Sequence, residues 1–262
     1  MKILLSTSFD ESSNNALSYT KLLLEKDPFN KSIVFLVHAH HSKTAYSLEE
    51  AESQLKSEFN ELKSYHSECE SLIHKGSIRH VINALVDIHS IDLVIMGSRD
   101  KDPGSQGVLI SNAMEVATHS NCSVLIIPES LTVSEGPKSI AFGSDFNKMD
   151  VPREALGVLK NLLKAFEATL KVFHVYPEGD LSVLRDELEQ SATKNFIEKS
   201  KHEYHPVINH ETIEGINLFL SNEKPDMLTV IPRKHKSMDE LYNPSVTKNM
   251  SHDVKLPLLV LR

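Results

Sequence analysis

The chain has 262 residues, of which 40% are hydrophobic and 24% charged, and its formal net charge is −8. This length accommodates two domains of ordinary size, each able to bury a core. The negative charge argues against nonspecific binding to nucleic acid or anionic membranes, and no apolar run approaches the roughly 20 residues that a membrane span requires. The two cysteines, Cys69 and Cys122, and an N-terminus without a secretory pattern predict a protein of the reducing cytoplasm.

The first half alternates short apolar runs with segments of helical periodicity. The apolar runs predict strands at residues 3–5, 33–38, 70–74, 93–96 and 123–127. Apolar residues at helical spacing predict helices around residues 16–24, 48–62, 78–86 and 111–119. Strands that are apolar on both faces, separated by amphipathic helices, indicate a parallel sheet covered by helices on both sides.

The second half repeats this order. Strands are predicted at residues 140–143, 170–175, 205–207, 227–231 and 256–261, and helices at 156–166, 181–199 and 213–220. A repeat of roughly 130 residues is too long for a solenoid and indicates two domain-sized copies. We therefore predict domains at residues 1–129 and 138–262, joined by a polar linker at 130–137 that contains Gly136 and Pro137.

Several segments carry a resemblance to a known family. They are the opening strands KILLSTSF and KSIAFGSDF, the second strands ending in LVH and VFHV, and the closing segment SVTKNM…LPLLVL. Each half resembles the universal stress protein family. The resemblance implies two doubly wound, five-stranded parallel α/β domains, Rossmann-like and similar to adenine nucleotide alpha hydrolases, with strand order 3-2-1-4-5. It also implies that the two halves pack as a pseudo-dimer through their final strands.

In ATP-binding members of that family, the loop after the fourth strand reads G-x-x-G, nine residues, then G-S or G-T. Glycines let backbone amides approach phosphate oxygens, and the following helix offers free N–H groups. In the first half, Gly97 is kept, but Asp100 and Ile110 stand at the other two glycine positions. Other candidate nucleotide contacts in this half are Ser8 at the family's acidic position, Val37, Ser98, Ser111 and Asn112.

The second half departs from the family loop differently. Asp145 matches the acidic position, and Ser245, Val246 and Thr247 match the helix start. Pro232, His235 and Pro244 stand where the resemblance expects glycines, and the two prolines remove backbone donors. Arg233, Lys234 and Lys236 add charge nearby, which fits a solvated basic loop and leaves open an anion site made by side chains.

Other chemistry has weaker support. His38 and His40 share a strand face, and His202, His205 and His210 cluster in the second half, but neither group has the spacing of a structural zinc site. His38 and His174 occupy equivalent strand positions, which favours packing. No nucleophile elbow, Walker loop, zincin or C-x-x-C motif is present, so we predict no catalytic residues and no metal ligands.

The sequence thus predicts a cytoplasmic, non-enzymatic regulatory or interaction module of the universal stress protein type with degenerate nucleotide-binding loops. Two alternatives stay open. One is a protein that binds ATP or AMP through an altered loop in one domain, with the first half as the better site. The other, with less support, is a metal-dependent hydrolase. The expected partner is an unidentified protein, and a homodimer stays open.

Overall fold

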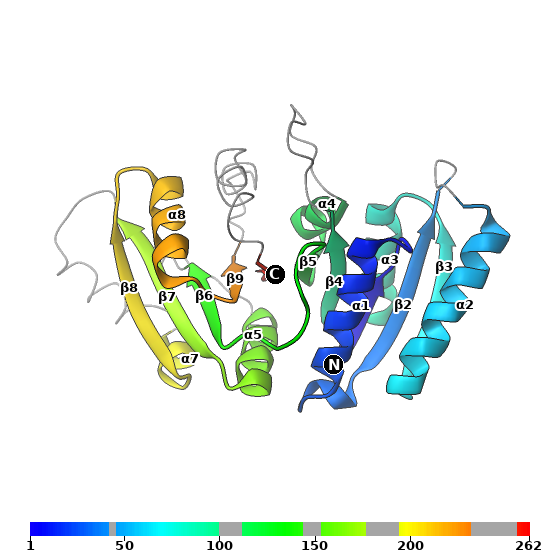
Figure 1. The fold of residues 1–262 in the computed structure, drawn as a ribbon, viewed down its shortest axis with the longest axis horizontal. Coiled ribbons are helices and arrows are strands. Elements are labelled where there is room, and N and C mark those ends of the chain that lie inside the picture. The colour runs from blue at the N-terminus through cyan, green and yellow to red at the C-terminus, as the bar shows by residue number, and fades with distance from the viewer. Residues whose placement is uncertain (42–45, 100–111, 144–152, 177–193, 232–255) are drawn as a thin grey trace. The chain divides into compact units, whose positions relative to one another are not determined.

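The structure is a computed structural model that describes the chain except for residues 42–45, 100–111, 144–152, 177–193 and 232–255. The chain divides into two compact units, residues 1–136 and 137–262 (Figure 1). The division falls inside the segment 130–137 that the sequence marks as a linker. Pairing of the two units through their final strands stays a prediction.

The first unit is an α/β unit whose described helices and strands follow the predicted order. They are β1 (Lys2–Ser6), α1 (Glu11–Leu24), η1 (Phe29–Lys31), β2 (Ile33–His40), α2 (Leu48–Tyr65), β3 (Cys69–Lys75), α3 (Ile78–His89), β4 (Leu93–Ser98), α4 (Asn112–His119) and β5 (Ser123–Pro128). The strands are parallel and lie in the order β3-β2-β1-β4-β5, which confirms the predicted 3-2-1-4-5 order. Figure 1 shows α1 and α2 on one face of this sheet and α3 and α4 on the other.

Burial explains why the first sheet is apolar on both faces. In β1, Ile3 and Leu4 point to opposite faces and are both fully buried, as are Leu36 and Val37 in β2. Helices therefore cover both sides of the central strands. The edge strand β3 is the exception, because it is only partly buried and its sequence is correspondingly polar.

The second unit shows the same order. Its described elements are β6 (Ser139–Gly143), α5 (Arg153–Phe166), β7 (Thr169–Tyr176), α7 (Lys194–Glu198), β8 (His202–Ile208), α8 (Thr212–Glu223), β9 (Met227–Val230) and β10 (Leu258–Val260). The strands run β8-β7-β6-β9-β10, which is the 3-2-1-4-5 order again. Most of the helix predicted at 181–199 lies outside the described residues, and its end is helical in α7.

Two local devices recur in both units. The carboxylate of Asp92, before β4, accepts from the Lys2 amide at 2.7 Å, and that of Asp226, before β9, accepts from the Ser139 amide at 2.8 Å. The helices α3 and α8 both end on a left-handed residue, Ser90 with φ of 53° and Lys224 with φ of 42°. Such C-caps satisfy the last carbonyls of a helix. Their presence in both copies marks them as part of the folding unit.

None of the helices in the described part of the chain is long and apolar enough to cross a membrane.

Candidate functional site

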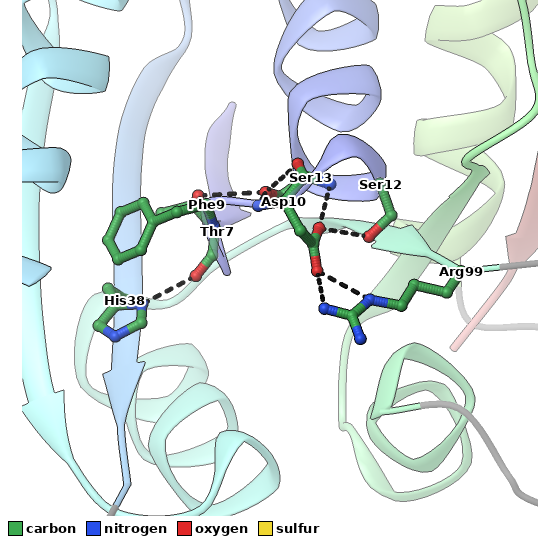
Figure 2. A network of polar contacts seen from close by, with 7 residues as sticks. All are labelled: Thr7, Phe9, Asp10, Ser12, Ser13, His38 and Arg99. Carbon is green, nitrogen blue, oxygen red and sulfur yellow. Dashed lines mark hydrogen bonds and ion pairs between the residues drawn. The ribbon is translucent and has the colours of Figure 1, made fainter. Parts of the chain in front are cut away.

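The candidate site lies where the order of the first sheet reverses, at the carboxyl ends of β1 and β4. These strands are direct neighbours, with Ser6 opposite Met96. Ligands of doubly wound sheets bind at such a switch point. We call residues 7–13, which follow β1, and residues 97–99, which end β4, the switch-point site (Figure 2).

The turn after β1 is closed by hydrogen bonds and one aromatic contact. The Thr7 amide donates to the Val37 carbonyl at 2.9 Å, and the Phe9 amide donates to the Thr7 hydroxyl at 3.1 Å. Phe9 has φ of 61°, a conformation that costs a residue with a side chain about 1–2 kcal/mol. Its ring stacks on His38, with 4.4 Å between centroids and 28° between the ring planes. This contact helps to fix the turn that places Asp10 at the start of α1.

Asp10 begins α1 with a reciprocal capping box. Its Oδ1 accepts from the Ser13 amide at 3.0 Å, while the Ser13 hydroxyl accepts from the Asp10 amide at 3.0 Å. The Ser12 hydroxyl also donates to Oδ1, at 2.7 Å. The Ser13 amide, one of the free amides in the first turn of α1, is thus satisfied within the chain, and a carboxylate at a helix N-terminus is favoured by the helix dipole.

Arg99 completes the coordination of the Asp10 carboxylate. Its Nε and Nη2 both donate to Oδ2, at 3.0 and 2.7 Å (Figure 2). Burial raises the pKa of Asp10, but the hydrogen bonds from Ser12, Ser13 and Arg99 outweigh it and lower that pKa to about 2. The same pair raises the pKa of Arg99. The aspartate side chain is 19% exposed and the arginine side chain 71%, so a fixed anion holds a cation that faces solvent.

Gly97, which the sequence pattern places at the first glycine of the family loop, is required by packing. A Cβ at this position would lie 2.1 Å from the carbonyl oxygen of Ser12 and 2.8 Å from the Ser13 nitrogen. Both atoms belong to the backbone of α1, which cannot move aside as a flexible side chain would. The end of β4 therefore touches the first turn of α1, and only glycine allows that contact.

The other described candidates of the first half lie near the carboxyl ends of β1, β2 and β4 and at the start of α4. Ser8 is exposed, and its hydroxyl helps to lower the pKa of Asp10. Val37 is fully buried, and its backbone carbonyl accepts from the Thr7 amide at 2.9 Å. Ser98 is half-buried, and its carbonyl accepts from the Glu129 amide at 2.9 Å. Asn112 begins α4 and is exposed.

Five further candidates lie outside the described residues: Ser111, Asp145, Ser245, Val246 and Thr247. The register of the second sheet nevertheless corrects one assignment. Leu93 lies opposite Ile3, and Met227 lies opposite the equivalent Ile140. Counting four residues onward, the position of Gly97 is taken by Ile231, and not by Pro232 as the sequence pattern suggested. An apolar strand can be aligned one residue too early or too late and still match the sequence pattern. The strand pairing identifies the correct alignment.

The histidines hold backbone and ring contacts. His38 Nδ1 donates to the Thr7 carbonyl at 3.0 Å, and burial lowers its pKa, so the neutral ring keeps Nε2 as an acceptor. Among the described residues, that buried Nε2 has no hydrogen-bond partner. In the second unit, the rings of His202 and His205 contact Tyr204 and Phe219, and His205 also lies within 3.4 Å of carboxylates on Glu203 and Glu223.

Within the described residues, no group of three or more histidine, cysteine, aspartate or glutamate side chains is placed to hold a metal ion. Cys69 and Cys122 are both buried free thiols. Burial raises the pKa of each thiol to about 11, which keeps it protonated and unreactive at neutral pH.

Sequence reasoning missed Asp10 and Arg99, the centre of the polar network. A signal existed for Asp10, because an aspartate directly before a helical apolar pattern is a preferred N-cap. Arg99 gave no such signal, since a single arginine after a strand usually faces solvent. Its partner lies 89 residues away in sequence.

Fold and site together define the chain as a pair of Rossmann-like, doubly wound α/β units with a nucleotide-binding type of strand order. Residues 1–128 match the model of the Universal stress protein family, so the first unit is a domain of that family.

Solved structures extend the likeness to the whole chain. A universal stress protein from Archaeoglobus fulgidus DSM 4304 is 17% identical, with a TM-score of 0.73 over 100% of this chain and 98% of that one. A functionally unknown protein from Pseudomonas aeruginosa PAO1 is 15% identical, with a TM-score of 0.64 over 99% and 92%. A universal stress protein family member from Arabidopsis thaliana with AMP bound is 22% identical, with a TM-score of 0.35 over 49% and 91%. No curated protein matches the sequence. The first two structures span nearly the whole chain, and at these identities their likeness establishes the fold of both units.

Proposed function

We propose that this chain is a universal stress protein that acts as a regulatory or interaction module, with nucleotide-binding loops too degenerate to bind ATP in the family manner. The observation that carries the proposal is the Asp10–Arg99 pair. At the switch point, Asp10 caps the Ser13 amide in the first turn of α1 and forms an ion pair with Arg99. One amide of the first turn of α1 and two of the five N–H donors of Arg99 are thus used inside the protein.

The retained glycine gives little support to ATP binding. Gly97 is explained by its contact with the Ser12 carbonyl, so its presence does not require a phosphate nearby. The other two glycine positions of the first half hold Asp100 and Ile110, which add a carboxylate and a branched side chain. Both changes oppose close approach of phosphate oxygens to the backbone.

The competing candidate is an ATP- or AMP-binding protein that works through an altered loop in one unit. The observation in its favour is that Ser98 and Asn112 stand at the end of β4 and the start of α4, where the family loop begins and ends. Of the two units, the first is the better candidate, because Ile231 replaces the glycine in the second. A metal-dependent hydrolase has no comparable observation behind it.

The deciding experiment is a nucleotide measurement on the purified full chain. Acid extraction followed by chromatography should release no stoichiometric AMP or ATP, and calorimetry with magnesium and ATP should give no Kd below about 1 mM. A site with a Kd of 10 µM would instead stabilise the protein by about 2.7 kcal/mol at a hundredfold ligand excess. A clear thermal shift with millimolar ATP would therefore overturn the proposal.

If nucleotide does bind, its location must be assigned without changing Gly97, because that substitution damages packing. Asp145→Ala is the better probe. Loss of binding in Asp145→Ala would place the site in the second unit, whereas unchanged binding would leave the first unit as the site.

A further inference from the structure

Arg99 has binding capacity that its contact with Asp10 does not use. A guanidinium group carries five N–H donors. In this structure Nε and one N–H of Nη2 donate to Asp10 Oδ2, which leaves three donors outside the pair. The side chain is 71% exposed and stands at the switch point, so these donors lie where a ligand of this fold class would arrive.

Asp10 is built to remain an anion. Its two oxygens accept hydrogen bonds from the Ser12 hydroxyl, the Ser13 amide and two Arg99 nitrogens, and the Ser8 hydroxyl also stabilises the anion. A carboxylate and a phosphate oxygen recognise a guanidinium in the same way, through short charge-assisted N–H···O bonds. The carboxylate therefore occupies the part of Arg99 that would otherwise take two oxygens of a phosphate.

The local charge balance has the same effect. Arg99 contributes one positive charge, while Asp10 contributes one negative charge and Glu129 is close enough to act on Arg99 electrostatically. Counted over these three described groups, the charge around Arg99 is negative, which disfavours an arriving anion. Removing the Asp10 charge makes this balance neutral and frees two aligned donors.

We propose that Arg99 is a phosphate-binding side chain of the first unit and that Asp10 holds it in an autoinhibited state as an internal substitute for the phosphate. The inference goes beyond the proposed function, because it explains why nucleotide binding is weak and names the contact that suppresses it. The ligand class is a phosphate ester or a polyphosphate, bound by exchange of Arg99 from the carboxylate to the ligand.

Neutralising Asp10 while keeping its helix cap tests the proposal. Asparagine and serine are as good as aspartate at an N-cap, so Asp10→Asn and Asp10→Ser retain the start of α1. Calorimetric titration of inorganic pyrophosphate, and separately of ATP, into the full chain should show at least tenfold tighter binding for both variants than for the unaltered protein. In the double variant Asp10→Asn, Arg99→Gln, this gain should disappear.

Glu61→Gln provides a matched control for net charge. Glu61 forms an ion pair with Lys21 elsewhere in the first unit, so this variant removes one negative charge without touching Arg99. Its pyrophosphate affinity should stay within about twofold of the unaltered protein. Circular dichroism melting establishes that every variant is folded at the temperature of the titration.

Two outcomes overturn the inference: folded Asp10 variants that bind pyrophosphate no better than the Glu61→Gln control, or a gain that survives in the double variant. A gain with pyrophosphate alone assigns a free-anion site, and an equal gain with ATP assigns a nucleotide phosphate. Tight ATP binding by the unaltered chain would refute the proposed function instead. The inference would then be judged by whether Arg99→Gln lowers that affinity.

Discussion

The two units share their scaffold and differ at the switch point. Both keep the strand order, the aspartate that binds the start of the first strand, and the left-handed C-cap before the fourth strand. At the end of the fourth strand, the first unit has Gly97 packed on α1, whereas the second has Ile231. Features kept in both copies therefore belong to folding. Features present in one copy reflect local packing or a separate role.

A second difference shows compensation between a helix and a strand. In the second unit, a Cβ on Gly215 of α8 would lie 2.4 Å from Val175 Cγ1 of β7. Register and helix caps make Val81 and Ala39 the equivalent residues of the first unit. The first unit thus has valine on the helix and alanine on the strand, whereas the second has glycine on the helix and valine on the strand. Close-packed interiors require such paired changes.

The largest effect is expected from Gly97→Ala. Because the added Cβ would meet the backbone of Ser12, we expect the free energy of unfolding to fall by about 3 kcal/mol, the upper end of typical overpacking. Ile231→Val at the equivalent position should cost only about 1 kcal/mol. Urea unfolding followed by circular dichroism measures both. Equal losses would show that Gly97 is not a packing residue, and a role in the phosphate loop would then explain its presence better.

Acid should weaken the first unit through Asp10. The pKa of Asp10 in the folded protein is about 2, below the ordinary value of 3.8. The ionised carboxylate therefore stabilises the fold fully above about pH 4, and this stabilisation is lost as the pH falls through about 2. The shift corresponds to about 2 kcal/mol.

Asp10→Asn should therefore lose about 2 kcal/mol of stability at pH 7 and approach the unaltered protein near pH 2. Hydrogen exchange read by mass spectrometry can follow this in peptides of residues 1–136, with peptides of the second unit as internal control. A deficit that stays constant from pH 7 to pH 2 would contradict the assigned cause.

Smaller effects should follow from the pair Gly215 and Val175. Gly215→Ala should destabilise by about 1–2 kcal/mol, because Val175 is stiff and blocks the new methyl group. In the double variant with Val175→Ala, the two losses should be less than additive by at least 0.5 kcal/mol. Gly157→Ala is the matched control.

Gly157 lies inside α5 with open space around its Cβ position, so alanine there should stabilise the helix by about 0.5–1 kcal/mol. Thermal melting of the four variants tests the set. Strict additivity of the Gly215 and Val175 changes would show that the two residues do not share one space.

The sequence located the elements well because their signals are local. Apolar runs and helical spacing placed every described strand, including the weakly apolar β3 and β8, which the repeat made recognisable. The candidate site was predicted only in outline. Gly97 and Ser98 lie at the end of β4 and Val37 lies opposite the end of β1, whereas the glycine position of the second half was displaced by one residue. The position of each of these residues depends on contacts between segments that are distant in sequence.

By itself, the sequence determined the duplicated α/β organisation, the parallel sheets and the loss of family glycines, because periodicity and repetition act over short stretches of chain. Only the tertiary structure decided what the remaining polar residues do. Asp10 and Arg99 are 89 residues apart and meet because β1 and β4 are neighbours in the sheet. Gly97 is fixed by a backbone contact with α1 that no local pattern encodes. Long-range contacts of this kind are set by the fold as a whole, and it is there that the site acquires its chemistry.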